Sequence, residues 1–393
     1  MATETLSRDD HDDQSRDTPA AAIRSGGALP CQTAPHSEEQ AAAEVLTRAR
    51  AAVDPVLRGA IESMPASMAR VAGYHFGWRE ADGTLSSADP GKAIRPALVL
   101  AAAQACAGVP ATLTGSLVAA TAPATAPARA AVKAAAAVEL VHNFTLLHDD
   151  VIDRDETRRH RLTAWRVFGT TEAILAGDAM HSLALRTLAE DAHPAAAPAM
   201  RRLAHCVVEL CDGQQADCAF ERRSTVSLAE CLAMAEAKTG ALLGCACAIG
   251  ALYGGAGEAT ADAMDAFGRE IGLAFQLIDD LIGIWGDPAV TGKPAGADLL
   301  ARKKSLPVVA ALCSGTGAGA ELAELYALER PLADVEVRRA ADAVDRAGGR
   351  AWAQGASCER MAAAIDHLAE AVPLPEAADD LLALAELVTR RNR

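Results

Sequence analysis

Apolar residues recur with helical spacing from Glu39 to the end of the chain, and this periodicity constrains the fold more than any other feature of the sequence. Aromatic residues make up 3% of the chain and alanine is abundant, which favours helix over strand. No segment alternates apolar and polar residues in the manner of a half-buried strand. We therefore predict one all-α domain.

The predicted helices are separated by two segments of loop character. The clearest helical blocks are 39–72, 92–107, 129–153, 171–190, 197–222, 228–253, 258–286, 304–314, 319–328, 333–347 and 355–391. Residues 108–128 form a low-complexity loop of Ala, Thr and Pro that looks like an insertion, and residues 286–298 are rich in Gly and Pro. Residues 1–38 hold almost no large apolar side chains, so we predict a disordered arm ahead of a helical domain at 39–393.

Charge and cysteine content exclude several classes of protein. The chain has 37 basic and 52 acidic residues and no concentrated basic run, which argues against a nucleic-acid partner. Its ten cysteines form no C-x-x-C pair, so reduced thiols in a cytosolic enzyme explain them better than a disulfide or zinc framework. Residues 97–128 carry no charge, but Gly and Pro interrupt them, so we expect no membrane span there. The N-terminus is acidic and polar, so we expect no signal peptide and a cytoplasmic protein.

A polar stripe runs along the apolar helix predicted before residue 153. His142, Asp149 and Asp153 lie within about 20° of one line on a helix of 3.6 residues per turn. Two carboxylates one turn apart can jointly hold a hard cation through oxygen. The alternative is a solvated acidic helix end, because Asp155 and Glu156 follow directly.

A second acidic cluster favours the metal site. The segment FQLIDDLIG places Gln276 and Asp279 on one helix face, with Asp280 adjacent, among apolar residues. Buried acids are costly unless cations pair with them. Two such stripes on separate helices suit a cavity that holds a diphosphate through several Mg²⁺ ions, since magnesium takes one or two carboxylates plus substrate phosphates.

Basic residues lie near both clusters and complete the predicted site. Together they carry enough positive charge for two diphosphates, one bound through metal and one held by cationic side chains alone. These polar and basic residues are Lys92, Arg95, Arg158, Arg159, Lys238, Thr239, Lys293 and Lys303.

Over roughly residues 45–390 the sequence resembles the trans-isoprenyl diphosphate synthase (polyprenyl synthetase) family. The resemblance rests on GKAIRP, VELVHNFTLLHDDVIDRDETRRHR, AILAGDAM, GQQADC, AKTG, FQLIDDLIGIWGD and GKPAGADLLARKKSLP. It implies an all-α isoprenoid synthase bundle around a central cavity. The implied reaction is the condensation of isopentenyl diphosphate with an allylic diphosphate, to give a short-chain product such as geranylgeranyl or farnesyl diphosphate.

The resemblance also implies a role for each site residue. Asp149, Asp153 and Asp279 would bind Mg²⁺, about two to three ions per site. The allylic diphosphate would be held by Arg158, Lys238, Thr239, Gln276, Lys293 and Lys303. Isopentenyl diphosphate would be held by Lys92, Arg95, His142 and Arg159.

Two departures from the family pattern bear on these roles. The second motif usually ends in Asp at the position of Gly283, so an outer carboxylate is missing, and Asp287 would replace it if the helix continued. The usual Gly and Pro after the paired arginines are His160 and Leu162, which leaves the shape of that loop open.

Product length, assembly and class are further expectations from the resemblance. Phe144 and Thr145 stand five and four residues before the first motif, where the growing tail would pass; Phe144 would stop the chain, or would instead be a core aromatic. A homodimer is expected, and the arm is similar to extensions that dock prenyl transferases inside encapsulin shells. A class I terpene cyclase and a non-catalytic regulatory subunit are the alternative functions.

Overall fold

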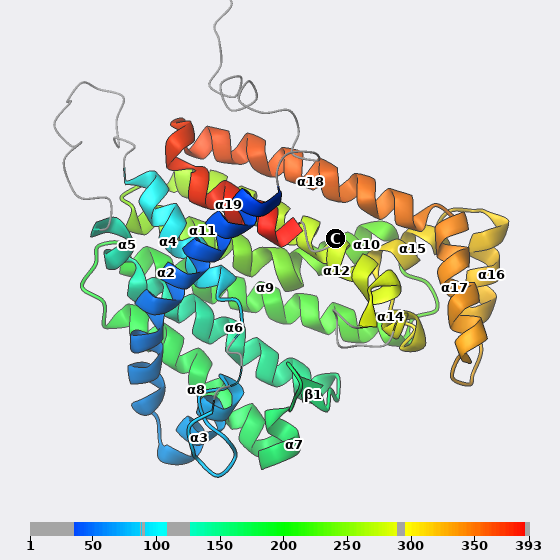
Figure 1. The fold of residues 1–393 in the computed structure, drawn as a ribbon, viewed down its shortest axis with the longest axis horizontal. Helices are drawn as coiled ribbons and strands as arrows, with labels where there is room; N and C mark the ends of the chain where they lie inside the picture. Colours follow the sequence, from blue (N-terminus) through cyan, green and yellow to red (C-terminus); the bar gives the residue numbers. More distant parts are fainter. Residues whose placement is uncertain (1–34, 87, 89–90, 108–125, 289–294, 390–393) are drawn as a thin grey trace, which may run out of the picture.

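The computed structural model describes residues 35–86, 88, 91–107, 126–288 and 295–389, and over these the chain is almost entirely helical (Figure 1). The elements in chain order are α2 (Pro35–Glu62), α3 (Ala66–His75), α4 (Ile94–Cys106), α5 (Ala126–Ala130), α6 (Val132–Ile152), β1 (Thr157–Arg158), β2 (Arg161–Leu162), α7 (Ala164–Phe168), α8 (Thr170–Ala189), α9 (Ala196–Arg222), α10 (Leu228–Ala235), the π-helix η1 (Glu236–Gly240), α11 (Ala241–Tyr253), α12 (Glu258–Trp285), α14 (Ala297–Leu300), α15 (Leu306–Leu312), α16 (Gly317–Tyr326), α17 (Asp334–Arg346), α18 (Gly349–Ala371), the 3-10 helix η2 (Pro375–Ala377) and α19 (Asp379–Thr389).

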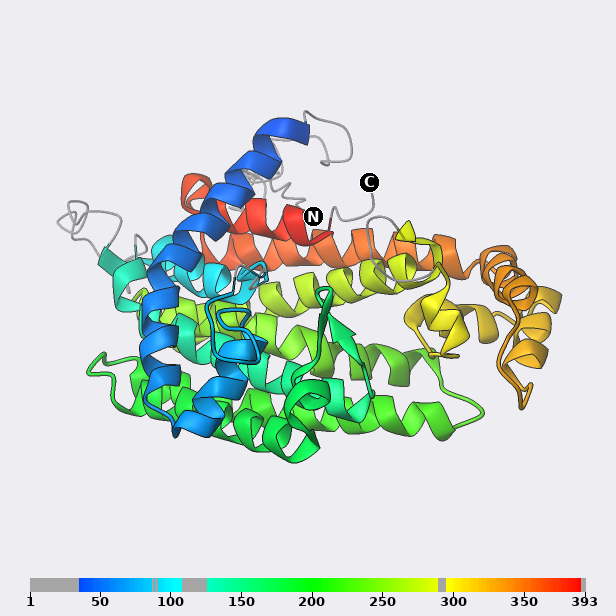
Figure 2. The same ribbon diagram turned by 60° about the horizontal axis from the view of Figure 1, so that its bottom comes forward.

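The long helices run side by side and form the body of the molecule. Helix α12 packs against both α11 and α18, α6 packs on α8, and α4 packs on α11. At one end α2 crosses the other helices, and α16 and α17 project from the opposite end, as both views show (Figures 1 and 2). The all-α prediction is confirmed.

Helix α11 is the core of this bundle. Each of its residues, Ala241–Tyr253, is buried, as expected for a helix that is apolar on every side. The continuous stretch Leu228–Tyr253 is long and apolar enough to cross a membrane, but 72% of the tested window is buried inside the fold. A bent pair, Leu306–Leu312 and Gly317–Tyr326, passes the same test only when joined across a 117° break. A buried core helix accounts for the first stretch.

Glycines let α12 approach α11 and η1 at backbone distance. A Cβ added at Gly268 would lie 2.4 Å from the carbonyl oxygen of Leu243. A Cβ at Gly272 would lie 2.5 Å from the Cα of Gly240, the last residue of η1. Any larger residue would push the helices apart, so these glycines hold η1 against the middle of α12.

Several predicted boundaries differ from the structure. The block expected at 39–72 starts earlier, at Pro35, and breaks between α2 and α3, where Pro65 stands just ahead of α3. The block expected at 355–391 is two helices, α18 and α19, separated by a segment with prolines. Part of the 108–128 insertion, from Ala126, begins α5. Residues 1–34 and 108–125 lie outside the described residues.

Candidate active site

The first acidic cluster lies at the C-terminal end of α6. Asp149 is half-buried, and Asp153 is exposed one turn further along the same face. Burial raises the pKa of Asp149 to about 6; Lys238 opposes this shift and the charge of Asp153 adds to it. Burial also raises the pKa of Asp153, and the charge of Asp217 adds to that shift. A cation placed between these carboxylates would relieve their repulsion.

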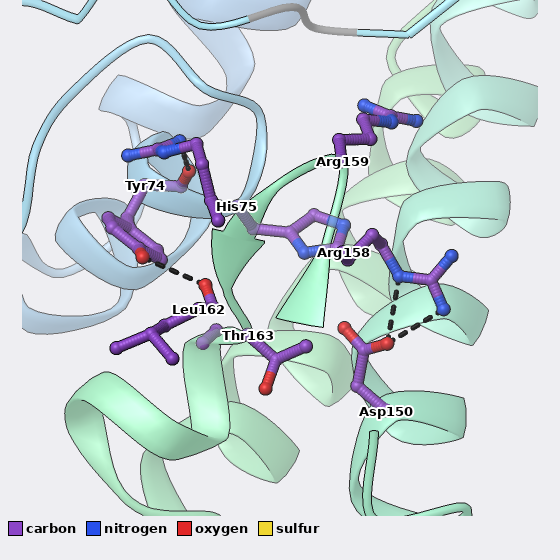
Figure 3. A pocket seen from close by; sticks show the side chains of 9 residues that line it. Tyr74, His75, Asp150, Arg158, Arg159, Leu162 and Thr163 are labelled. Atoms are coloured by element: carbon purple, nitrogen blue, oxygen red, sulfur yellow. Dashed lines mark hydrogen bonds and ion pairs between the residues drawn. The ribbon is translucent and has the colours of Figure 1, made fainter. Parts of the chain in front are cut away.

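Asp150, the residue after Asp149 on α6, is ion-paired with an arginine. It is 1% exposed, and Arg158 donates to its Oδ1 from Nε at 2.8 Å, with Nη2 of the same guanidinium at 2.7 Å (Figure 3). Its Oδ2 is buried and makes no hydrogen bond within the described part of the chain. The pair borders a cavity of about 30 Å³ that His75 also lines. Burial, with the charges of Arg158 and Arg159, lowers the pKa of His75 to about 3, so its imidazole is neutral.

The loop after the paired arginines is a two-stranded hairpin. β1 and β2 pair antiparallel, and the two turn residues, Arg159 and His160, have φ values of 51° and 61°. Positive φ at both central positions is what a tight type I′ hairpin turn requires, although a non-glycine residue pays about 1–2 kcal/mol there. The hydroxyl of Tyr74 donates to the carbonyl of Leu162 at 2.8 Å. The hairpin therefore forms without the family's usual Gly and Pro.

The hairpin turn places the side chain of Arg159 against Gly91, in the segment that precedes α4. A Cβ added at Gly91, where φ is +96°, would lie 2.4 Å from Nη2 of Arg159. Lys92 follows Gly91 directly and is exposed. The hairpin and the start of α4 thus bring these two predicted ligands of isopentenyl diphosphate together.

Arg95 and His142, the other two residues predicted to bind isopentenyl diphosphate, are in contact. Nη1 of Arg95 lies 3.1 Å from Nε2 of His142. Burial and the charges of Arg95 and Arg159 hold the pKa of His142 well below its ordinary value, so a neutral imidazole can accept a hydrogen bond from Arg95. Glu139, one turn before His142, is buried, accepts from Asn143 at 3.0 Å and lies near Arg95. The sequence interpretation missed Glu139, although a buried acid at i−3 from a site histidine was a usable signal.

The second cluster is organised by a chain of hydrogen bonds. Thr239 on η1 donates to Oε1 of Gln276 at 2.9 Å, and Nε2 of Gln276 donates to Oδ1 of Asp280 at 2.8 Å. Asp280 is 3% exposed, and its Oδ2 accepts the backbone N–H of Leu306 at 2.8 Å. Asp279 beside it is exposed. Asp280 therefore anchors α15, and Asp279 remains the carboxylate accessible to a ligand.

Lys238 joins the two clusters through η1. Its Nζ lies 2.5 Å from Oδ2 of Asp217 on α9, and its charge acts on both Asp149 and Asp153. Gly213 makes this possible, because a Cβ there would lie 2.6 Å from the backbone nitrogen of Lys238. Asp217 belongs to the GQQADC segment, but the sequence interpretation gave it no role.

Lys303 lies on the far side of the second cluster. Its pKa is raised, chiefly by Asp280 at 3.7 Å, while burial opposes the shift and Asp298, Asp217 and Asp279 add to it. The charge of Asp217 on α9 contributes to the raised pKa of both Asp153 and Lys303, so Asp217 lies within electrostatic range of both acidic clusters. Lys293 lies outside the described residues.

The suggestion that Asp287 continues the acidic face of α12 is wrong. The helix ends at Trp285, and Gly286 has an extended backbone with φ −65° and ψ 147°. Asp287 thus lies beyond the helix, where the spacing of one turn no longer applies.

The donors fit a hard divalent cation whose shell a ligand completes. Among the described residues, no group of three His, Cys, Asp or Glu side chains converges on one point as a protein-only cage. The available donors are carboxylate oxygens in pairs or singly, which suit magnesium, calcium or manganese. Magnesium is commonly held by one or two carboxylates, with substrate phosphates filling the remaining positions.

The family model for polyprenyl synthetase matches residues 84–344. The chain belongs to this family. It is 49% identical to a geranylgeranyl diphosphate synthase of Mycobacterium tuberculosis over 349 residues, which cover 88% of this chain and 93% of that protein. It is 41% identical to a (2E,6E)-farnesyl diphosphate synthase of Mycobacterium bovis over 352 residues, with the same two coverages.

Solved structures agree with the sequence relatives. A polyprenyl synthetase from Streptomyces coelicolor A3(2) superposes with a TM-score of 0.80 at 43% identity, covering 88% of this chain and 98% of that one. A geranylgeranyl pyrophosphate synthetase from Pyrococcus horikoshii gives 0.74 at 28% identity, covering 89% and 99%. The protein is therefore a short-chain trans-prenyltransferase, of a family that needs a divalent metal, and none of these matches favours a cyclase or a regulatory subunit.

In this polyprenyl synthetase, Phe144 on α6 packs its ring against α8. The ring is 8% exposed and stands 5.1 Å from the ring of His148 and 5.3 Å from that of His181 on α8, measured between centroids. The hydroxyl of Thr145 donates to the carbonyl of His142 at 2.8 Å. The structure thus places Phe144 in packing contact with a neighbouring helix, five residues before Asp149 on α6.

Proposed function

We propose that this polyprenyl synthetase is a magnesium-dependent, chain-elongating enzyme that makes geranylgeranyl diphosphate, with farnesyl diphosphate as the second candidate product. The observation that carries the proposal is the separation of its basic groups. Lys238 and Lys303 lie among the acidic clusters, whereas Arg95 and Arg159 lie near His142, which stands two turns of α6 before Asp149. The first group suits a metal-bound diphosphate, and the second suits one held by cations alone.

Different residues would bind the Mg²⁺ ions and the allylic diphosphate. Asp149, Asp153 and Asp279 would hold about two to three Mg²⁺ ions. When bound, Mg²⁺ supplies positive charge that offsets the charge developing on the leaving diphosphate. Lys238, with Thr239 and Gln276 beside it, would orient the allylic diphosphate. Arg158, Lys293 and Lys303 would complete its binding.

The condensation needs little further chemistry from the protein. The C–O bond of the allylic diphosphate breaks, and both electrons leave with the diphosphate. The double bond of isopentenyl diphosphate then donates its electron pair to the allylic carbon, and a proton passes to the released diphosphate. The neutral His142 and the guanidinium of Arg95 would position isopentenyl diphosphate, so that the reacting carbons meet in a site that excludes water.

The assembly and location are part of the same proposal. Exposed apolar side chains on the adjacent helices α8 and α9, namely Ile174, Leu175 and Val208, support a homodimer through this face. A cytoplasmic location agrees with the enzyme class. Docking of residues 1–34 into an encapsulin shell is proposed from the resemblance alone, because these residues lie outside the described part of the chain. Light scattering of the purified protein measures the dimer.

One assay tests the reaction. Purified protein is incubated with Mg²⁺, isopentenyl diphosphate and each of dimethylallyl, geranyl and farnesyl diphosphate, and the product is identified by chromatography after dephosphorylation. Elongation to geranylgeranyl diphosphate supports the proposal. Release of a cyclic hydrocarbon from a prenyl diphosphate, with no consumption of isopentenyl diphosphate, would contradict it.

A further inference from the structure

The two acidic clusters are built differently along their helices. In the first, Asp149 and Asp153 stand one turn apart on α6 and can reach the same cation. In the second, Asp279 stands on α12 and the residue one turn further along the same face is Gly283, which has no side chain. The space beside Asp279 that a second carboxylate would occupy is therefore open to another part of the chain.

The carboxylate of Asp298 fills that space. A Cβ added at Gly283 would lie 2.3 Å from Oδ2, 2.5 Å from Cγ and 2.9 Å from Oδ1 of Asp298. All three distances are far inside van der Waals contact, so the carboxyl group rests directly on the glycine backbone. Glycine at 283 and aspartate at 298 are thus matched to each other.

Local structure fixes Asp298 in this place. It lies on the short helix α14, which Gly296 precedes with a φ of +75°. The carbonyl of Asp298 accepts the backbone N–H of Lys303 at 2.8 Å, and its carboxylate contributes to the raised pKa of the Lys303 side chain. The same segment therefore carries the acid and the lysine to one end of α12.

We infer that Asp298 supplies the second carboxylate of the acidic cluster on α12, reaching over Gly283 toward the divalent cation that Asp279 holds. The inference rests on the metal role proposed above for Asp279. It makes the loop before α15 part of the metal site, and it assigns to Asp298 the position that Asp153 has in the first cluster. Asp298 acts either as a ligand or through a water in the cation's shell; both make metal affinity depend on its charge.

A different role would leave metal affinity unchanged. If Asp298 served only to hold Lys303, its loss would weaken binding of the allylic diphosphate without altering the cation. Direct metal binding separates the two roles. The probe is Mn²⁺ alone, without diphosphate, followed by electron paramagnetic resonance of free Mn²⁺, so that a change in diphosphate binding cannot alter the result.

The first variant is Asp298→Asn, which keeps the size of the side chain and removes its charge. We expect Mn²⁺ affinity to fall about 10–100-fold, the usual effect of losing a partner of the metal shell. Asp287→Asn is the matched control, because that residue lies past the end of α12 and should bind Mn²⁺ as the unaltered protein does. Unchanged affinity in Asp298→Asn would overturn the inference.

A second pair of variants moves the carboxylate from the loop to the helix. Gly283→Asp alone should lower the Tm, because its Cβ collides with Asp298. Combined with Asp298→Gly, it should recover most of the Mn²⁺ affinity that Asp298→Gly loses. Failure to recover it in a folded double variant would contradict the proposed position of the carboxylate.

The variant Asp279→Ala distinguishes a failure of this inference from a failure of the proposed function. Weak Mn²⁺ binding in Asp279→Ala with normal binding in Asp298→Asn would refute the inference and keep the metal site. Normal binding in both variants would refute the assigned role of Asp279 as well.

Discussion

Two cationic side chains of the site are each held by an acidic side chain before any substrate is present. Arg158 is paired with Asp150, and Lys238 is paired with Asp217. Long basic side chains lose much rotamer freedom on binding, so holding them in place lowers that cost when the diphosphate arrives. We therefore propose that these acids position the basic side chains, and that the carboxylates proposed to bind the cation are a separate set.

Removing either carboxylate of the first cluster should abolish turnover and leave the fold intact. Asp149→Ala or Asp153→Ala deletes charge that would hold the cation at the leaving group, so we expect kcat to fall by about 10³-fold or more. Asp153 is exposed and Asp149 half-buried, so the Tm should change little. Steady-state kinetics and thermal unfolding measure both. Asp212→Ala, an exposed acid on α9, is the control, and near-normal turnover in either site variant would contradict the assignment.

Mutations should distinguish the binding site of isopentenyl diphosphate from that of the allylic diphosphate. Lys92→Ala or Arg95→Ala should raise the KM for isopentenyl diphosphate about tenfold or more, since each removes a charged hydrogen bond donor. Lys238→Ala should act mainly on the allylic substrate, because Lys238 lies with the carboxylates and not with His142. The KM for each substrate is measured with the other saturating. Equal effects on both substrates in all three variants would show that the division is wrong.

At the scale of elements, the site depends on a few places where helices approach closely. The glycines of α12 bring η1 into contact with it, so that Thr239 reaches Gln276. A π-helix has more residues per turn than an α-helix, and π-helical turns are frequent at functional sites. At the contact of α6 with α8 the rings of Phe144, His148 and His181 form a cluster.

Removing a ring from this cluster should lengthen the product. Phe144→Ala removes a ring five residues before Asp149 on α6, and the space gained can take at least one further isoprene unit. The change will also lower stability by about 3–5 kcal/mol, as loss of a buried ring does, so the assay belongs well below the Tm. Chain length is read by chromatography of the dephosphorylated products. If the variant keeps its activity and makes the same product, Phe144 is a core residue. His181→Ala then tests the neighbouring ring of the cluster.

At the scale of the whole molecule, the described residues contain both carboxylate clusters and both basic groups. The helical body runs from α2 to α19, and the site lies where α6, α9, η1 and α12 meet. None of the sequence motifs falls before residue 35. The N-terminal arm is therefore expected to serve something other than catalysis.

Deleting residues 1–34 should leave kcat and KM within about twofold of the full chain, because the arm carries no motif and its composition predicts disorder. Truncation at this point keeps all of α2. The second measurement is co-purification with an encapsulin shell protein, which the full chain should show and the truncated chain should lose. An inactive but folded truncation would mean that the arm takes part in the active site.

Helical periodicity and motif spacing are local properties of the chain, so the all-α class, most helix positions, the family and the two acidic motifs could be predicted from the sequence alone. Tertiary structure decided which charges meet. The Arg158–Asp150 and Lys238–Asp217 pairs join residues whose contact depends on how helices pack and turn. The tertiary structure also shows where helices end, since α12 ends at Trp285. The space beside Gly283 is occupied by the carboxylate of Asp298, fifteen residues further along the chain. A glycine in a sequence shows that a side chain is missing, and only the fold shows which group occupies the space.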